Sequence, residues 1–338
     1  MPLKTPSVEH YDDDRYVPLR DLLDDWVRSL KAANTAEATL KSYREVATEF
    51  CDFLDCEPGV PKAPEGLKRT HVDAYLAHLQ RRPARTTTGR LSASTVAKQY
   101  RSLMQLFRWL VEVEEVLPVS PMARMSPPQV EKKTVPVITQ EHLSALFATC
   151  STNAFKDRRD LLLMHMLFDT GVRNGELTGM LLSDVLQDRG QIVVRGKGNK
   201  ARNVTFGNTT GVMLRRYLRS RSQHRDRHDE GLWLGRMGRL TESGIADAIE
   251  QRCIQAGIPH VNPHRFRHTF AHLFLLNGGQ EGDLMHLAGW ASREMVNRYG
   301  ASAKAERAHE AHRANNVADQ LAAKRESKVA RRGRKPGG

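Results

Sequence analysis

The sequence predicts a mainly helical protein of two domains, an N-terminal helical bundle and a C-terminal α+β domain with a small antiparallel sheet. Its 338 residues are enough for two domains that each bury a core of ordinary size. Apolar residues recur at helical spacing from about residue 19 to residue 117, whereas β-prone runs with a hairpin signature occur only in the second half. Five prolines lie in residues 118–136, between these two halves.

The first domain is expected over residues 17–117, after an N-terminal extension of residues 1–16. Its first helix is indicated by an apolar stripe that consists of Leu22, Leu23, Trp26, Val27 and Leu30. Further helices are expected over residues 36–54, 69–80 and 94–116. Four amphipathic helices of this length predict a bundle.

The last of these helices has two distinct faces. Leu103, Leu106 and Leu110 lie on the apolar face, and Lys98 and Arg101 lie on the polar one. The two cations are candidate DNA contacts, and a solvated helix face explains them equally well.

The chain after residue 117 is expected to contain a linker, a catalytic domain and a tail. Residues 118–136 have the proline-rich, weakly apolar composition of a semi-rigid linker. The second domain is expected over residues 137–312. Residues 313–338 form a basic tail in which residues 317–321 could continue a helix.

Within the second domain, an apolar helix around residues 161–168 is expected to stop at Gly171, a plausible left-handed cap. A hairpin is expected from the β-prone runs 191–195 and 203–206, with Lys197 near its glycine-flanked tip. Asn262 and Pro263 favour a helix start, and that helix ends at residues 278–279. A shorter helix over residues 292–299 is expected to end at Gly300, before a separate candidate helix over residues 302–323.

The formal net charge of +13 favours a polyanionic partner, because a basic surface attracts phosphate backbones through counterion release. Membrane-surface binders and ribosome-associated proteins are also basic. Three aspartates at residues 12–14 stand where a secretion signal needs apolar residues, and no apolar run has membrane-spanning length. A cytoplasmic protein with no membrane partner is therefore expected. The four cysteines have no CxxC spacing and are expected to be reduced.

His264, His268 and His272 recur every four residues and would share one helix face, which is a spacing that zinc sites use. Two observations argue against a metal here. Arg265 and Arg267 would repel a dication, and no nearby carboxylate or cysteine offers a clear further ligand. No metal and no cofactor are expected, and His268 and His272 are interpreted as packing or hydrogen-bonded residues.

An anion is the better partner for this helix. A buried Arg267, three residues after His264, needs a negative charge, and phosphate is the natural candidate in a basic protein. Arg173 follows the glycine break at residue 171, where Glu176 could orient it from one helical turn away. The two arginines could clamp both non-bridging oxygens of one phosphodiester.

Five segments in order carry a specific family resemblance: TGVRNGEL, RGKGNKAR, HRFRH, LAGW and NRYG. They resemble the catalytic boxes of the tyrosine recombinases, the family of the Xer recombinases and phage integrases. The similarity covers roughly residues 137–300. The N-terminal helices resemble the family's SAM-like core-binding domain only in size and helicity.

The resemblance implies a role for each matching residue. Arg173 and Arg267 would stabilise the negative charge on a pentacoordinate phosphorus, and Tyr299 would be the nucleophile. Lys197 would be the general acid for the departing 5′ oxygen, and His264 would assist deprotonation of the tyrosine. Glu176 would help to fix the site. Lys200 and Arg202 are further candidate DNA contacts, and Lys200 is close enough in sequence to compete with Lys197 for the acid role.

Trp290 departs from the commonest family pattern, which has histidine at that position. An indole N–H can donate one hydrogen bond but cannot titrate, so proton transfer falls to His264 and Lys197. Trp290 would orient phosphate or pack against the tyrosine segment. A plain core tryptophan is the alternative.

The reaction implied by the resemblance is site-specific recombination through a 3′-phosphotyrosyl intermediate and a Holliday junction. The implied partners are double-stranded DNA with two recombination sites and a homotetramer on that DNA, alone or with a related recombinase or accessory factor. The mobile-element integrases and Xer-type resolvases both fit, and the shortness of residues 1–16 favours a two-domain enzyme. A type IB topoisomerase-like enzyme and a non-catalytic DNA-binding regulator on the same scaffold are the alternatives.

Overall fold

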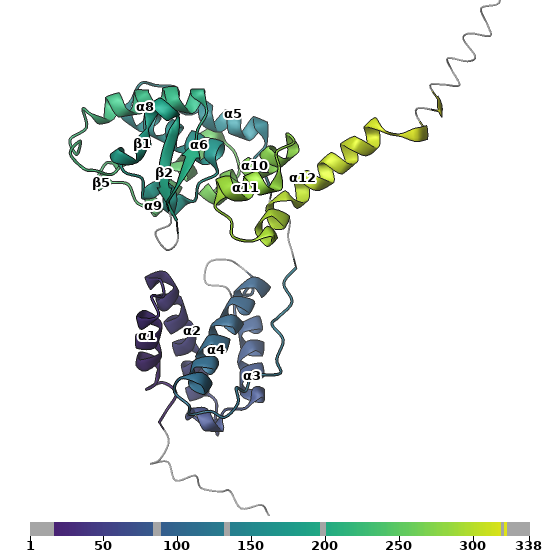
Figure 1. Cartoon of the computed structure of the whole chain (residues 1–338). Coiled ribbons are helices and arrows are strands. Elements are labelled where there is room, and N and C mark those ends of the chain that lie inside the picture. Colours follow the sequence, from purple (N-terminus) through teal and green to yellow (C-terminus); the bar gives the residue numbers. More distant parts are fainter. Residues whose placement is uncertain (1–16, 84–88, 132–135, 197–200, 319–320, 323–338) are drawn as a thin grey trace, which may run out of the picture. The chain divides into compact units, whose positions relative to one another are not determined.

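The structure of the chain is a computed structural model. It describes residues 17–83, 89–131, 136–196, 201–318 and 321–322, without the side chains of residues 298, 299, 301 and 302. The chain separates into two compact units that divide between Lys132 and Lys133 (Figure 1). Each unit has its own hydrophobic core.

The first unit is a bundle of four α-helices: α1 (Leu23–Ala32), α2 (Glu37–Cys56), α3 (Arg69–Arg81) and α4 (Ala93–Glu112). Aromatic side chains fill its centre. The ring of Phe50 meets Tyr75 and Phe107 edge-on, with centroid distances of 5.0 and 6.0 Å. The hydroxyl of Tyr75 donates to Gln99 at 2.7 Å, so this buried polar group has a partner.

Helix α4 ends at Glu112, four residues before the predicted end. The chain reverses at Glu115, whose φ is +56°, and Pro118 disfavours the helical conformation for the residue before it. The residues that follow pack on the bundle, because Leu117 and Met122 are buried in its core. The carbonyl of Met125 accepts a hydrogen bond from Tyr100 at 2.8 Å. The start of the proline-rich segment therefore belongs to the first unit.

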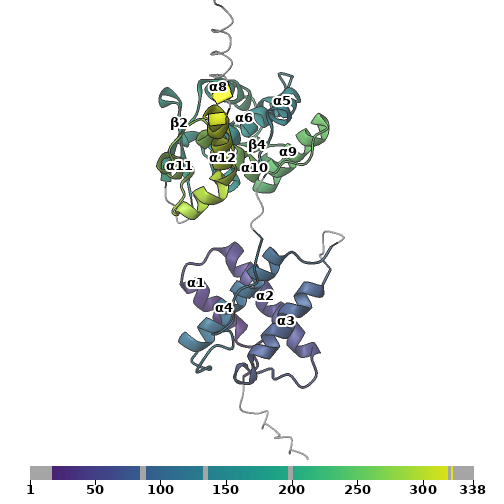
Figure 2. The same cartoon turned by 90° about the vertical axis from the view of Figure 1, so that its right-hand side faces the viewer.

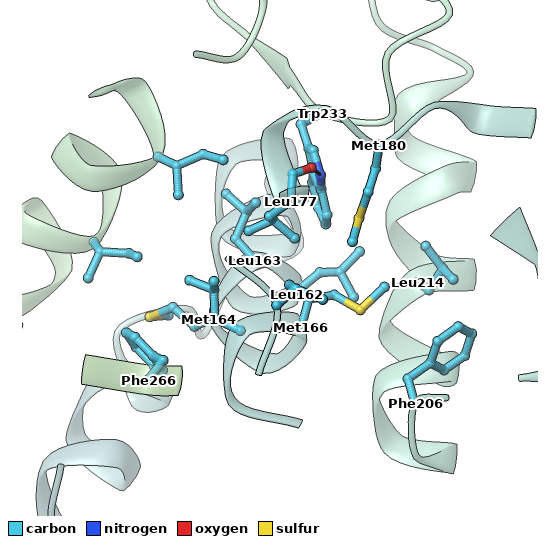
Figure 3. Close-up of a cluster of buried hydrophobic side chains, with 14 of the residues drawn as sticks. Leu162, Leu163, Met164, Met166, Leu177, Met180, Phe206, Leu214, Trp233 and Phe266 are labelled. Atoms are coloured by element: carbon cyan, nitrogen blue, oxygen red, sulfur yellow. Dashed lines mark hydrogen bonds between the residues drawn. The ribbon is translucent and has the colours of Figure 1, made fainter. Parts of the chain in front are cut away.

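Helix α6 (Phe155–Thr170) lies at the centre of the second unit. It packs against α8 (Asn208–Arg221), α9 (Glu242–Ala256) and α10 (Pro263–Leu276). Leu162, Leu163 and Met166 of α6 meet side chains from several of these elements in the core shown in Figure 3. The remaining helices of this unit are α5 (Gln140–Ala148), α7 (Asn174–Thr178), α11 (Glu281–Ala288) and α12 (Arg293–Ala314).

A three-stranded antiparallel sheet has the order β1 (Val185–Leu186), β2 (Gln191–Arg195) and β3 (Ala201–Thr205). The predicted hairpin is present as β2 and β3, whereas the two residues of β1 are too few to give a sequence pattern. Strands β4 (Leu234–Gly235) and β5 (Gly238–Arg239) form a second, two-stranded sheet. A mainly helical chain with a small antiparallel sheet confirms the predicted fold class.

The predicted helix end at Gly300 is wrong, because α12 continues without interruption from Arg293 to Ala314. A Cβ atom on Gly300 would lie 2.6 Å from Cδ1 of Leu275 on α10. The glycine therefore permits close approach of two helices and does not cap one. Figures 1 and 2 both show α12 beside α10 and α11. Among the described residues, none of the helices is both long and apolar enough to cross a membrane.

A buried ion-pair network ties α6 to α9. Asp160 accepts hydrogen bonds from Arg159, at 2.9 and 2.7 Å, and from Arg252, at 2.9 and 2.7 Å. All three residues are buried. Arg159 also donates to the carbonyl of Leu234 on β4 at 3.1 Å, so the network connects two helices and a strand.

We expect Asp160→Asn to lower the free energy of unfolding of the second unit by about 3–5 kcal/mol, because it leaves the buried Arg159 without its carboxylate and Arg252 with that of Asp157 alone. Urea unfolding followed by circular dichroism measures this change. Asp188→Asn is the matched control, because Asp188 is exposed. Equal stability of the two variants would contradict a supporting role for the network.

Candidate active site

Arg173 follows a sharp turn at the end of α6. Gly171 adopts the left-handed conformation with φ +62°, and a Cβ atom there would lie 2.2 Å from the ring of Phe270. Glycine is therefore required both for the turn and for the close contact with α10. The turn makes Arg173 the N-cap residue of α7, with 43% of its side chain exposed.

Glu176 of α7 accepts hydrogen bonds from the residues around this turn, and only 3% of its side chain is exposed. Its Oε2 accepts from the backbone N–H of Arg173 at 2.9 Å, and its Oε1 accepts from Nη1 of Arg173 at 2.8 Å. Both oxygens also accept from Arg202, each at 2.9 Å. Burial raises the pKa of Glu176, but the hydrogen bonds from Arg202 and Arg173 outweigh burial and lower the pKa to about 2.

Arg267 of α10 lies on the inner side of the same turn and is 1% exposed. It donates to the carbonyl of Gly171 at 2.5 Å and to the carbonyl of Ala288 at 2.6 Å. Its guanidinium carbon lies 5.2 Å from the ring centroid of Trp290, within the range of a cation–π contact. Arg267 therefore connects the end of α6, the end of α11 and the tryptophan.

The C-terminal end of α11 brings three arginines together. Three successive carbonyls, those of Leu287, Ala288 and Gly289, accept hydrogen bonds from Arg202, Arg267 and Arg173 respectively. A helix C-terminus carries partial negative charge, so it stabilises cations. The three arginines come from β3, α10 and the start of α7, so this helix end sets the spacing between elements that are distant in sequence.

Trp290 follows the left-handed Gly289 and is 6% exposed. It packs in a small cluster with Leu284, Val296 and Ala303, and it also contacts Arg267. Trp290 therefore lies against the tyrosine-bearing helix and beside Arg267, and its expected role in orienting a phosphate stays a prediction.

His264 lies in the first turn of α10, three residues before Arg267. Asn262 caps this helix by accepting from the backbone N–H of Arg265 at 3.0 Å, as the sequence predicted. The His264 side chain is exposed, and its ring lies edge-on to His268 with a centroid distance of 5.0 Å. His268 and His272 are buried, and His272 pairs with Glu306 of α12 at 3.2 Å.

Several predicted residues are placed only in part. Lys197 and Lys200 lie outside the described residues, in the segment that joins β2 to β3. The backbone of Tyr299 lies within α12, and its side chain is not described. Lys98 and Arg101 are exposed on α4 of the first unit. The described residues that the structure brings together are Arg173, Glu176, Arg202, Arg267 and Trp290.

The partners of Arg202 were not foreseen from the sequence, which suggested a DNA contact. Its side chain is 16% exposed and binds Glu176 and the carbonyl of Leu287. A signal was present, because Arg202 is two residues from the buried Val204 and so shares the inner face of β3. A charged residue on that face requires a buried counter-ion.

Comparison with known proteins identifies the class. Residues 136–306 match the phage integrase family, and residues 22–115 match the N-terminal SAM-like domain of phage integrases. The chain therefore belongs to the phage integrase family and is a tyrosine recombinase.

Its relatives include two enzymes named tyrosine recombinase XerC. That of Oceanobacillus iheyensis is 31% identical over 265 residues, which is 77% of this chain and 84% of the relative. That of Staphylococcus carnosus is 29% identical over 265 residues, which is 77% of this chain and 85% of the relative.

Solved structures share the fold at lower identity. The XerH recombinase bound to a palindromic difH substrate has a TM-score of 0.67 at 18% identity, and the match covers 87% of this chain and 84% of that one. A λ integrase dimer on a COC′ core site has a TM-score of 0.64 at 18% identity, covering 85% and 78%.

Glu176 predicts a distinct acid sensitivity. Since its pKa is lowered to about 2, it contributes stability above its ordinary pKa near 4.5 that is lost as the pH falls toward 2. We expect acidification from pH 6 to pH 3 to cost the wild type about 2 kcal/mol more than Glu176→Gln. Urea unfolding at both pH values tests this. Glu230→Gln, at an exposed glutamate, should keep the wild-type slope, and parallel curves for all three proteins would refute the assignment.

Proposed function

We propose that this tyrosine recombinase exchanges strands between two DNA sites, with Tyr299 as nucleophile and Arg173 and Arg267 as the phosphate-binding pair. The observation that carries the proposal is the convergence of these two arginines on one helix end, with Glu176 between Arg173 and the protein interior. Arg173 is half exposed and can meet a phosphate directly, whereas the buried Arg267 fixes the floor of the site.

The proposed reaction is a pair of transesterifications. The phenolic oxygen of Tyr299 attacks the scissile phosphorus, His264 takes the phenolic proton, and the P–O5′ bond breaks as Lys197 protonates the departing 5′ oxygen. A 3′-phosphotyrosyl bond and a 5′ hydroxyl result. The 5′ hydroxyl of the partner duplex then attacks this bond and releases the tyrosine. The number of phosphodiester bonds is unchanged, so no external energy source is required.

The position of His264 supports its role, because it is exposed one helical turn before Arg267 and can reach a group bound there. A free tyrosine ionises near pH ~10, so it needs a proton acceptor at neutral pH. Because the indole of Trp290 cannot accept a proton, His264 is the candidate acceptor for the proton of the tyrosine.

The proposed assembly is a tetramer on two duplexes that passes through a Holliday junction, alone or with a related recombinase or accessory factor. A λ integrase tetramer bound to a Holliday junction shares this fold, with a TM-score of 0.64 at 18% identity. Residues 308–314 of α12 are exposed and offer a docking segment to a second copy. The relatives named above are recombinases, so the topoisomerase alternative is not favoured.

We expect Tyr299→Phe to bind DNA with wild-type affinity and to form no covalent complex. The wild-type chain is incubated with sheared genomic DNA of its source organism, covalent complexes are trapped with detergent, and the attached ends are sequenced to give the cleavage site. Tyr299→Phe is then tested on that duplex. Covalent complex formation by this variant at the wild-type rate would overturn the assignment of the nucleophile.

The first unit is tested by salt dependence. If Lys98 and Arg101 each contact one phosphate, Lys98→Ala and Arg101→Ala should each reduce the slope of log affinity against log salt by about 1. The slope is obtained from DNA affinities measured by fluorescence anisotropy at salt concentrations from about 50 to about 200 mM. An unchanged slope in both variants would identify them as a solvated helix face.

A further inference from the structure

Arg202 lies within the site and has little access to solvent. Each nitrogen of its guanidinium has an acceptor: Nη1 and Nη2 bind the two oxygens of Glu176 at 2.9 Å, and Nε binds the carbonyl of Leu287 at 3.2 Å. Such a fork geometry is specific to arginine and fixes the side chain in one orientation. Three of the five N–H groups of Arg202 therefore donate to acceptors of the protein itself.

Arg173 binds the same carboxylate and the same helix end as Arg202, but a different carbonyl. It donates to Oε1 of Glu176 at 2.8 Å and to the carbonyl of Gly289 at 3.3 Å, two residues after the carbonyl that Arg202 binds. Its side chain is nevertheless 43% exposed, against 16% for Arg202. Two arginines thus share one carboxylate and one helix end, and only one of them faces solvent.

The charges of this group favour a division of roles. The single negative charge of Glu176 is met by two bonds from Arg202 and by one guanidinium bond from Arg173. A buried carboxylate needs a counter-ion, since an uncompensated buried charge is strongly unfavourable. If Arg202 were removed, Arg173 would be the described cation in contact with Glu176. Its positive charge would then neutralise the carboxylate and would no longer be available to a bound phosphate.

The backbone contacts point the same way. A Cβ atom on Gly289 would lie 3.0 Å from the guanidinium carbon of Arg202, so the turn after α11 is shaped around this side chain. That turn presents the Gly289 carbonyl to Arg173 and continues into Trp290, which contacts Arg267. Loss of Arg202 would therefore loosen the surface against which both phosphate-binding arginines rest.

We propose that Arg202 is a positioning residue that neutralises Glu176 and anchors the end of α11, so that the guanidinium of Arg173 stays oriented toward the scissile phosphate with its charge available. This inference rests on the proposed function, because it presupposes that Arg173 binds that phosphate. Arg202 itself does not touch the DNA.

The test compares Arg202→Met and Arg202→Lys with the wild type on two duplexes that contain the cleavage site recovered from covalent complexes. One duplex has the natural phosphodiester, and the other has a methylphosphonate at the scissile position. The methyl group removes the negative charge that Arg173 stabilises. A defect that acts through the charge of Arg173 is therefore smaller on the methylphosphonate.

On the phosphodiester, we expect Arg202→Met to slow covalent complex formation by about 10²-fold, the usual effect of losing one charge-stabilising donor. Arg202→Lys should be slowed less, by about tenfold, because a lysine keeps the charge but not the fork. On the methylphosphonate, both variants should approach the wild-type rate. Thermal unfolding and DNA affinity are measured for each variant, and Arg202→Lys carries the test if Arg202→Met does not fold.

Asn203→Ala is the matched control, because Asn203 is the next residue of β3 and is exposed. It should cleave both duplexes at the wild-type rate. An equal loss by the Arg202 variants on both duplexes, or no loss on either, would overturn the inference. A wild-type chain that yields no covalent complex on genomic DNA would instead overturn the proposed function, so the two failures are distinguishable.

Discussion

The second unit depends on a balance of charge at the end of α11. Three guanidinium groups meet there, and they would repel one another if nothing negative lay between them. The carboxylate of Glu176 and the successive carbonyls of residues 287–289 supply that negative charge. Burial alone would raise the pKa of this carboxylate, but the hydrogen bonds from Arg202 and Arg173 lower the pKa to about 2, so it stays ionised down to a pH near 2. The arginines are thereby held close together before any substrate binds.

The three arginines differ in burial. Arg267 and Arg202 are committed to acceptors within the protein, whereas Arg173 keeps a large part of its side chain in solvent. A preorganised charge of this kind acts on a bound anion without a reorganisation cost at the moment of reaction. The turn that precedes Arg173 is held in place because Gly171 packs against Phe270 of α10.

Local sequence rules predicted those elements whose limits are set locally. Asn262 caps α10, and Gly171 ends α6 in the left-handed conformation, because each depends only on neighbouring backbone groups. The motifs also predicted the family and the pairing of Arg173 with Glu176. The errors and omissions concern tertiary contacts. Gly300 was predicted to end a helix but accommodates Leu275, and the sequence did not indicate that Arg202, a candidate DNA contact, binds a carboxylate 26 residues away.

The helix that contains Tyr299 is held in a different way from the arginines. Gly300 allows close approach to Leu275 of α10, and Val296 and Ala303 of the same helix are buried in an apolar cluster with Leu284 and Trp290. Beyond them, α12 is fastened by Lys304 to Glu281 at 2.7 Å and by Glu306 to His272 at 3.2 Å.

The side chains of Lys304 and Glu281 are 42% and 39% exposed, and an exposed ion pair contributes only about 0–1 kcal/mol. The arginines proposed to bind phosphate are held by Glu176 and by the carbonyls at the end of α11, whereas the helix of Tyr299 is held by apolar packing and by partly exposed polar contacts. In the proposed reaction, the position of the Tyr299 backbone is therefore set by the packing of α12.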